Sequence, residues 1–395
     1  MMKWIWQNTT QVGFGVNAVK DHLNKFIKPK SKVLCTFGGG SIDKNGCRSD
    51  VNEALRALGC EVKWEGGIPA NPEYERLMEI VQIVREFQPN ILLAVGGGSV
   101  IDGTKFICCA ATLSSTEDAW DYIMYKHQEP EQTYKFGTVL TIPATGSEWN
   151  NGFVISRRET GWKIESAFPS TYPVFSLIDP RYTMTLPARQ LRNGVFDGFT
   201  HVIDQLLYPT KNPMCDDFFF SILKELVEIG PDVIKENSSL ELHERLIVAC
   251  SFALNYIFSF GKEAYWEIHI IGHQLTAKYG IDHGATLAMV MPTFLESQIE
   301  ERKEIYAKTA ESVFGEKEGT IEQKAVALIN HIRKFIRKLG LPETVSAWDG
   351  SKIENGDVDL VTENIFTQST DGKPFGYKDC CTKELVHKVL EKVIV

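Results

Sequence analysis

Two stretches of this chain repeat one order of local patterns, in which a short apolar segment is followed by three glycines and a serine and then by a helix-like segment. Residues 33–37 lead into residues 38–41, and residues 91–95 lead into residues 96–99. Strands that alternate with crossover helices lie parallel in one sheet, because each helix returns the chain to the same end of the sheet. The repeated pattern therefore predicts an α/β domain with a mostly parallel sheet.

The second half of the chain follows a different pattern. The α/β pattern extends from residue 32 to about residue 179, with a further strand expected at 138–142. Beyond Pro187, apolar residues recur at helical spacing and no convincing strand follows. The predicted helices cover residues 51–58 and 74–87 in the first half and residues 191–207, 216–229, 240–256, 265–279 and 321–339 in the second.

A chain of 395 residues is too long for one hydrophobic core. We therefore expect two domains, an α/β domain over residues 1–184 and an all-helical domain over residues 185–395. The boundary falls where Asp179-Pro180 and Leu186-Pro187 interrupt the pattern.

The composition is that of an ordinary soluble enzyme, with 43% hydrophobic residues, 24% charged residues and a formal net charge of −9. Nucleic acid is an unfavourable partner for so acidic a chain, because phosphate binding requires a basic surface. No run approaches the roughly 18 apolar residues of a membrane span, and the first residues lack the apolar centre of a signal peptide. We expect a cytoplasmic protein without membrane or nucleic-acid partners.

The cysteines and the charged segments carry no functional signal in the sequence. Nine cysteines include no Cys-x-x-Cys pair, so they are expected to be small core residues or incidental thiols, even where Cys380 and Cys381 are adjacent. The charge-rich helix expected over residues 300–318 is predicted to present a solvated face.

Candidate metal ligands are concentrated in the helical half of a chain that has only nine histidines. Asp197 and His201 are four residues apart, and so are His269 and His273, so on helices each pair lies on one face. His283 follows a turn-like segment. One carboxylate with two or three imidazoles and an open position suits Zn²⁺ or Fe²⁺ acting as a Lewis acid. The pattern predicts one such site, and spacing leaves open which of His269 and His273 is the ligand.

The two glycine loops indicate a nucleotide. A triple glycine between a strand and a helix lets backbone N–H groups approach a pyrophosphate at the positive end of the helix. The loop at 38–41 follows the first predicted strand, where such folds often bind adenosine, and it has no acidic residue to bind a ribose 2′-hydroxyl. Lys44 and Arg48 follow, which favours NADP(H). NAD(H) stays open because the charge of Asp43 opposes that of Lys44.

With these motifs, the chain resembles the iron-containing (group III) alcohol dehydrogenases, and among them the NADPH-dependent aldehyde reductases and butanol dehydrogenases. The matching segments are residues 13–15, 69–72, 96–105, 143–148, 179–180 and 282–284, together with the two pairs of metal-binding type at 197 and 201 and at 269 and 273. The resemblance covers nearly the whole chain. It implies a Rossmann-like N-terminal domain and an all-helical C-terminal domain, the architecture that dehydroquinate synthase shares, with cofactor and metal in the cleft. It also implies a homodimer.

Carried over position by position, the resemblance implies a set of site residues. One divalent ion, Fe²⁺ or Zn²⁺, would be held by Asp197, His201, His269 and His283. The implied cofactor contacts are Gly39, Gly40, Ser41, Gly97, Gly98, Ser99, Asp102, Lys105, Thr141, Thr145, Ser147 and Asn150. His273 would relay a proton and Asp102 would lie at the nicotinamide end, so these two are the predicted catalytic residues. The expected substrates are small to medium alcohols and aldehydes.

Three other interpretations stay open on the sequence. A polyol dehydrogenase of the glycerol type would have a sparser ligand set. A cyclising lyase of the dehydroquinate synthase type, which uses a metal and NAD, needs several basic residues. The predicted ligands instead have apolar and aromatic neighbours such as Phe196, Phe199 and Trp266. A non-catalytic binding protein could retain the fold, and a lack of turnover with several aldehydes would favour it.

Overall fold

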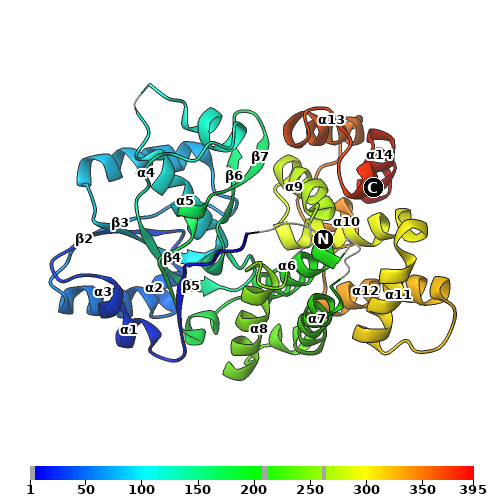
Figure 1. The fold of residues 1–395 in the computed structure, drawn as a ribbon, viewed down its shortest axis with the longest axis horizontal. Helices are drawn as coiled ribbons and strands as arrows, with labels where there is room; N and C mark the ends of the chain where they lie inside the picture. The colour runs from blue at the N-terminus through cyan, green and yellow to red at the C-terminus, as the bar shows by residue number, and fades with distance from the viewer. Residues whose placement is uncertain (1–4, 115, 207–211, 260–263) are drawn as a thin grey trace. The chain divides into compact units, whose positions relative to one another are not determined.

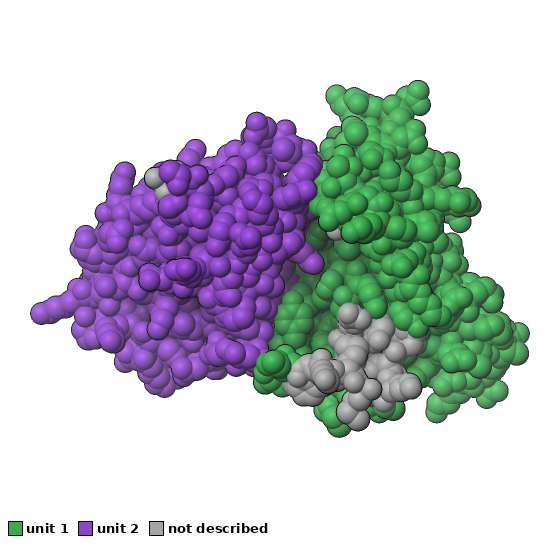
Figure 2. All heavy atoms as spheres, turned by 45° about the horizontal axis from the view of Figure 1, so that its top comes forward, with its two compact units in different colours: residues 1–6, 188–236, 248–395 green, residues 7–187, 237–247 purple. Residues whose placement is uncertain are grey.

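The computed structural model describes residues 5–114, 116–206, 212–259 and 264–395, which form two compact units coloured separately in Figure 2. The α/β unit contains Gln7–Pro187 and Asn237–Ile247. The helical unit contains Ala188–Glu236 and Val248–Val395, with Ile5 and Trp6. Helix α8 (Leu240–Ala253) is thus divided between the two units. None of the described helices is long and apolar enough to cross a membrane.

The α/β unit is built on six parallel strands in the order β1-β8-β5-β4-β2-β3. They are β1 (Gln11–Phe14), β2 (Lys32–Phe37), β3 (Glu61–Glu65), β4 (Ile91–Gly97), β5 (Phe136–Ile142) and β8 (Phe175–Ile178). A separate antiparallel pair is formed by β6 (Gly152–Arg157) and β7 (Trp162–Ala167). Residues of the central strand β4 are buried along its whole length, as expected of a parallel sheet with both faces covered.

Alternate side chains of β4 enter two different cores. Leu92 and Ala94 join the core formed with α4 (Tyr74–Phe87) and α5 (Gly98–Ala110), whereas Leu93 and Val95 join the core formed with α1 (Ala18–Phe26) and α3 (Cys47–Ala57). This follows from the period of two along a strand. Figure 1 shows these two helix layers on opposite faces of the sheet. The short helix α2 (Ser41–Lys44) follows β2.

The helical unit surrounds α10 (His283–Ser297), which is buried over most of its length. The other helices are α6 (Ala188–Leu206), α7 (Pro213–Val233), α9 (Glu267–Tyr279), α11 (Ile299–Phe314), α12 (Ile321–Leu339), α13 (Asp357–Ser369) and α14 (Lys383–Val393). Helix α10 packs against α6, α9, α12 and α14. The described part of this unit contains no strand, as predicted, and Phe375 and Cys381 form an isolated bridge.

Most predicted elements agree with the structure, and the differences lie at their ends. The helices expected at 74–87 and 321–339 coincide with α4 and α12. Strand β4 continues through two of its three glycines, and α5 begins at Gly98. Helix α9 begins two residues later than predicted because Trp266 has a left-handed φ of 53°. The helix expected over residues 240–256 ends at Ala253, and the last residue of the 191–207 prediction lies outside the described residues.

Helix α11 presents a solvated face as predicted, since Glu300, Glu301, Glu304 and Glu311 are exposed, but one charged residue of the segment lies on its buried side. Arg302 and Tyr306 of α11 are almost completely buried. A charged residue is buried when a distant segment supplies its partner, and local charge density does not report that partner.

Candidate metal centre and cofactor loops

Three helices of the helical unit converge on one buried carboxylate. Asp197 and His201 lie one turn apart on α6, His269 lies on α9, and His283 is the first residue of α10. Oδ1 of Asp197 is 3.6 Å from Nε2 of His201 and 3.6 Å from Nε2 of His283. Its distance to Nε2 of His269 is 3.7 Å. These distances exceed hydrogen-bond length, whereas ligand atoms in a tetrahedral shell at about 2.1 Å from an ion are separated by roughly 3.4 Å. The three distances from Asp197 are therefore those of a site suited to one divalent metal ion.

The residues on both sides of His283 contact α6 and hold His283 in this cluster. Asp282 accepts hydrogen bonds from Nε and Nη2 of Arg189 at 2.6 and 2.8 Å and from Nδ2 of Asn193 at 2.6 Å. Gly284 is pressed against α6, where an added Cβ would stand 2.4 Å from the carbonyl oxygen of Asn193. The Asp-His-Gly sequence at the start of α10 thus holds the imidazole close to α6.

Asp204, which sequence patterns did not single out, orients one of the imidazoles. It lies one turn beyond His201 on α6, and its Oδ2 is 2.5 Å from Nδ1 of His269. When Nδ1 donates to that carboxylate, the lone pair of Nε2 is available on the side of Asp197. Nε2 of His269 is buried and has no hydrogen-bond partner among the described residues, which is costly unless something binds there. A metal ion at this point would satisfy it.

Two of the imidazoles differ in their tendency to hold a proton. Burial lowers the pKa of His201 to about 4, against the opposing effect of the Asp197 carboxylate. Burial also acts to lower the pKa of His269, but its contacts with Asp197 and Asp204 outweigh burial and raise that pKa to about 9. At neutral pH the metal-free cluster therefore holds a proton on His269, which a metal ion must displace.

His273 lies one turn after His269 on α9 and is buried beside the cluster. Its ring centroid is 4.9 Å from that of His283 and 6.2 Å from that of His269. The ligand atoms of Asp197, His269 and His283 lie within 4.8 Å of one another. Of the two histidines that helical spacing left equivalent, the geometry favours His269 as a ligand and leaves His273 as a neighbour of the ligands.

In the α/β unit, the glycines at the end of β4 leave no room for side chains. An added Cβ would stand 2.8 Å from Ile142 at position Gly97 and 2.4 Å from Thr145 at position Gly98. Gly97 also precedes α5 without a side chain to cap it, and the first turn of α5 has no acidic residue. The positive end of α5 is therefore suited to an anion such as a pyrophosphate.

A buried charged network holds the loop that contains Thr145. Nζ of Lys105 donates to Oγ of Ser147 at 2.7 Å, to Oδ1 of Asn150 at 3.1 Å and to a carbonyl of β6 at 2.7 Å. Ser147 donates to Oδ1 of Asp102 at 2.5 Å, and the other oxygen of Asp102 accepts from a backbone N–H of β6 at 3.0 Å. Burial lowers the pKa of Lys105 to about 8 and raises that of Asp102. Because Nζ already makes three contacts and both Asp102 oxygens are engaged, the pair is suited to positioning this loop.

The loop after β2 is open where the loop after β4 is tight. Nothing lies within 4 Å of a Cβ added to Gly39, and Gly39, Gly40 and Ser41 are exposed. Neither glycine has a positive φ, so neither packing nor backbone conformation requires glycine at these positions. A remaining physical reason for glycine at positions 39 and 40 is that a ligand approaches the backbone closely there.

An arginine beside this loop faces its one acidic residue. The guanidinium of Arg48 lies 4.7 Å from the ring centroid of Phe37 and 4.6 Å from that of Trp64. Its Nη1 is 3.3 Å from Oδ1 of Asp43. Arg48 therefore partly neutralises the carboxylate that opposes Lys44.

The structure brings the predicted cofactor residues to the carboxyl ends of three neighbouring strands, which is where parallel α/β folds bind nucleotides. They are Gly39, Gly40 and Ser41 after β2, Gly97, Gly98, Ser99, Asp102 and Lys105 at the end of β4 and in α5, and Thr141, Thr145, Ser147 and Asn150 at and after the end of β5. Sequence reasoning missed Asp204 and the Arg189–Asp282 tether. The available signal for Asp204 was its helical spacing from Asp197 and His201.

Comparisons with known proteins cover nearly the whole chain. Residues 9–180 match the family model described as iron-containing alcohol dehydrogenase, and residues 193–391 match the model for the C-terminal part of the Fe-containing alcohol dehydrogenase family. The chain is 41% identical over 349 residues to the NADPH-dependent aldehyde reductase YqhD of Escherichia coli, covering 87% of this chain and 89% of that one. It is 34% identical over 395 residues to the probable NADH-dependent butanol dehydrogenase 1 of Bacillus subtilis, covering 99% of both. A crystal structure of the E. coli protein superposes with a TM-score of 0.92 at 36% identity, over 98% of each chain.

Proposed function

Because the chain belongs to the iron-containing alcohol dehydrogenase family and is a metal-dependent alcohol dehydrogenase or aldehyde reductase, we propose that it transfers a hydride between NADP(H) and small to medium alcohols or aldehydes. The observation that carries this proposal is the single carboxylate of Asp197 with three imidazole Nε2 atoms at 3.6–3.7 Å. Residues 1–184 are the proposed cofactor domain and residues 185–395 the proposed metal domain.

Asp197, His201, His269 and His283 would hold Fe²⁺ or Zn²⁺. When bound, such an ion supplies Lewis acidity toward the oxygen of the alcohol or carbonyl. Asp204 orients His269 for this task through its contact with Nδ1. His273, buried beside His283, is the group proposed to hold and deliver the proton that an aldehyde needs to become an alcohol.

The α/β unit would bind the cofactor, which supplies or accepts the hydride at its nicotinamide. Gly97, Gly98 and Ser99 would bring backbone N–H groups to the pyrophosphate at the start of α5. Lys105 and Asp102 would keep Ser147 and its loop in place, so Asp102 acts in this proposal as a positioning residue.

Preference for NADP(H) is proposed from the open loop after β2. Gly39 and Gly40 leave space near Ser41 for a 2′-phosphate, and Arg48 partly neutralises Asp43. The relatives include both an NADPH-dependent aldehyde reductase and a probable NADH-dependent butanol dehydrogenase, so the local charge at this loop is the argument for NADP(H).

The metal requirement is tested with protein stripped of metal and reconstituted separately with Fe²⁺ and Zn²⁺. Oxidation of NADPH and of NADH by butyraldehyde is then followed for each form. Metal-dependent turnover with NADPH preferred is expected. Bound metal without turnover of any aldehyde by either cofactor would contradict hydride transfer to aldehydes.

A second pair of variants tests the cofactor loop on its own. Ser41→Asp adds a carboxylate where a 2′-phosphate is proposed, and Asp43→Asn removes one nearby. The ratio of kcat/KM for NADPH to that for NADH is expected to fall in the first variant and to rise in the second. If both variants kept the wild-type ratio, the 2′-phosphate would have to bind at another place.

The predicted homodimer is tested by light scattering on the purified protein during size-exclusion chromatography. A mass of twice the 44.5 kDa chain is expected. A monomer of full activity would contradict the analogy on which the prediction rests.

A further inference from the structure

A second buried carboxylate lies at the first turn of α9, two residues before the proposed ligand His269. Glu267 is completely buried and accepts hydrogen bonds from the guanidinium of Arg302 at 2.6 and 3.4 Å. Its Oε1 also accepts from the backbone N–H of Tyr377 at 2.9 Å. The guanidinium is a permanent cation, so this carboxylate is paired within the chain.

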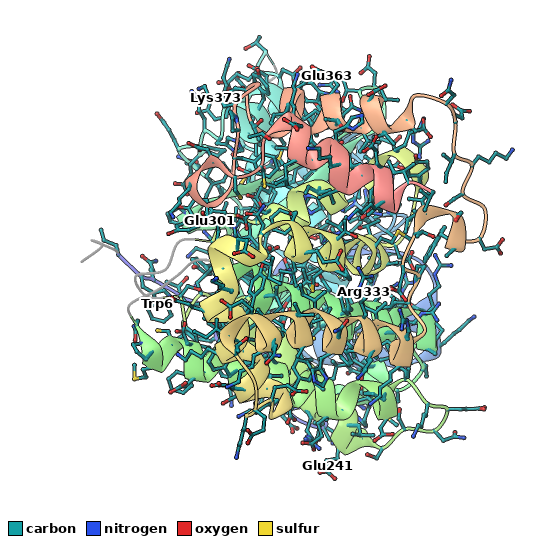
Figure 3. All side chains as sticks on the ribbon, turned by 90° about the vertical axis from the view of Figure 1, so that its right-hand side faces the viewer. Trp6, Glu241, Glu301, Arg333, Glu363 and Lys373 are labelled. Atoms are coloured by element: carbon teal, nitrogen blue, oxygen red, sulfur yellow. The ribbon has the colours of Figure 1, made fainter. Side chains whose placement is uncertain are left out.

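The loop over this pair is tightly constrained. Residues 375 and 381 close it through two backbone hydrogen bonds, and Lys378 and Asp379 both have left-handed φ values of 53° and 56°. Lys378 also pairs with Glu301 of α11 at 3.1 Å, and Figure 3 labels Glu301 on that helix. Gly376, with a φ of 84°, fits against Glu267, where an added Cβ would stand 2.8 Å from Oε1. These constraints hold the adjacent cysteines, Cys380 and Cys381, at a defined point.

The two adjacent thiols differ in access and environment. Cys381 is completely buried, whereas Cys380 is partly exposed, and their Sγ atoms are 3.8 Å apart. Nη2 of Arg302 is 3.3 Å from Sγ of Cys380. The hydrogen bond from the Cys381 thiol holds the pKa of Cys380 below its ordinary value, and the charge of Arg302 acts in the same direction against burial and Glu267. Burial raises the pKa of Cys381 well above its ordinary value.

Glu267 and these two thiols could in principle bind a metal, since their ligand atoms lie within 4.8 Å of one another. A cation there would have to approach the Arg302 guanidinium, which is buried and already satisfies the carboxylate. Thiol oxidation has no such obstacle, because it needs only a thiolate that a small oxidant can reach.

We propose that Cys380 and Cys381 form a peroxide-sensitive thiol pair, in which Cys380 is the reactive thiol and Cys381 the resolving one. The thiolate of Cys380 attacks one oxygen of hydrogen peroxide, so that an S–O bond forms, the O–O bond breaks and hydroxide leaves as water after taking a proton. The Cys381 thiol then attacks the sulfenic sulfur, an S–S bond forms and a second water leaves. Two thiols and one peroxide thus give one disulfide and two waters.

The disulfide changes the surroundings of α9. Its sulfur atoms must approach to about 2.05 Å from their present separation, so one of them has to move. Cys381 is buried and its backbone is paired with that of Phe375, which leaves Cys380 to move, and the sulfur of Cys380 contacts both Arg302 and Glu267. Oxidation therefore loosens the contacts that hold Glu267 at the start of α9.

The pair is tested on the whole protein with hydrogen peroxide followed by trypsin. The peptide covering residues 379–383 contains both cysteines, and in the oxidised protein it is expected to be lighter by two hydrogen atoms. Cys381→Ser should stop the reaction at a Cys380 sulfenic acid that dimedone traps, and Cys380→Ser should abolish both products. Unchanged peptide mass, or a stable oxygen adduct on Cys380 in the wild-type protein, would overturn the disulfide.

Cys60 provides a matched control, because among the described cysteines it is the other one that is partly exposed. Burial raises its pKa, and no arginine contact is found for its Sγ among the described residues. At neutral pH, Cys380 is expected to react with iodoacetamide several-fold faster than Cys60, because the pKa of Cys380 is lowered and that of Cys60 is raised. Equal rates would overturn the proposed activation of Cys380.

The effect on α9 is measured by hydrogen exchange on peptides from residues 265–275. Faster exchange in the first turn of α9 is expected after oxidation of the wild-type protein, and no change is expected in Cys380→Ser. An oxidised protein with unchanged exchange there would show that the pair does not act on α9. This test does not depend on hydride transfer, so it can fail or succeed independently of the proposed function.

Discussion

Two of the buried polar residues of helix α9, His269 and Glu267, belong to clusters of different design. In the cluster of His269, three imidazole Nε2 atoms face the Asp197 carboxylate, and the buried Nε2 of His269 has no hydrogen-bond partner among the described residues. In the cluster of Glu267, the guanidinium of Arg302 lies against the carboxylate. A buried carboxylate needs a cation, and the difference lies in whether the chain supplies a permanent one or a titratable imidazole whose proton a metal ion can displace.

The largest expected effect follows from removing the central charge of the first cluster. Asp197→Asn should lower aldehyde reduction on the order of a thousandfold, because Lewis acidity contributes several kcal/mol to such reactions. Steady-state kinetics and metal content check it. Asp216→Asn, which alters another buried helical aspartate in the same unit, is the control and should retain activity. If Asp197→Asn kept full metal content and activity, Asp197 would not be a metal ligand, and the proposed difference between the two clusters would be wrong.

Removing the internal cation should damage the second cluster in a different way. Arg302→Met leaves the Glu267 carboxylate buried and unpaired, which should cost about 3–5 kcal/mol in the free energy of unfolding. Urea denaturation checks it. Adding Glu267→Gln should restore a large part of that loss. A single variant as stable as the wild type would show that water or another group replaces the guanidinium.

Asp204→Asn should weaken the metal site without removing a ligand. The carboxylate that accepts from Nδ1 of His269 becomes an amide, and such changes typically lower metal affinity about 10–100-fold. Competition with a chelator of known affinity measures it. Affinity equal to that of the wild type would mean that α9 packing alone orients the imidazole.

Metal affinity and metal-free stability should respond to pH with opposite signs. His269, with a pKa raised from 6.5 to about 9, contributes stability that is fully present below pH 6.5 and is lost as pH rises through 9. Over the same range metal affinity should rise about tenfold per pH unit, because fewer protons must be displaced. His201, with a pKa near 4, stays neutral throughout. Calorimetry of metal binding and denaturation of the metal-free protein test the two trends. If metal affinity and metal-free stability both rose or both fell with pH, His269 would not be the group that holds the proton.

The smallest effect is expected for an ion pair on the surface of the same unit. Glu363 of α13, labelled in Figure 3, lies 2.8 Å from Nζ of Lys383, and both side chains are mostly exposed. Glu363→Gln should leave the unfolding free energy unchanged within the error of the experiment, since solvent screens such pairs. A loss comparable to that of Arg302→Met would show that burial does not explain the importance of the Glu267 pair.

The arrangement of elements could be predicted closely because it rests on local periodicity. Helices α4 and α12 coincide with the predicted ranges, and the two strands before the glycine loops lie where the apolar segments indicated. The site residues that share one helix could also be predicted, since a spacing of four residues places Asp197 beside His201. The environment of Cys380 could not be predicted in this way, because its cationic neighbour Arg302 lies 78 residues away in the sequence.

Sequence alone determined the fold class, the two glycine loops and the candidate ligands, because each depends on residues within a few positions of one another. The tertiary structure decided which imidazoles face Asp197, that Asp204 orients His269, and that Arg302 lies inside the protein with Glu267. These outcomes depend on helices that approach each other only after folding. The charge balance of a buried site is therefore set by distant partners, and no local pattern contains it.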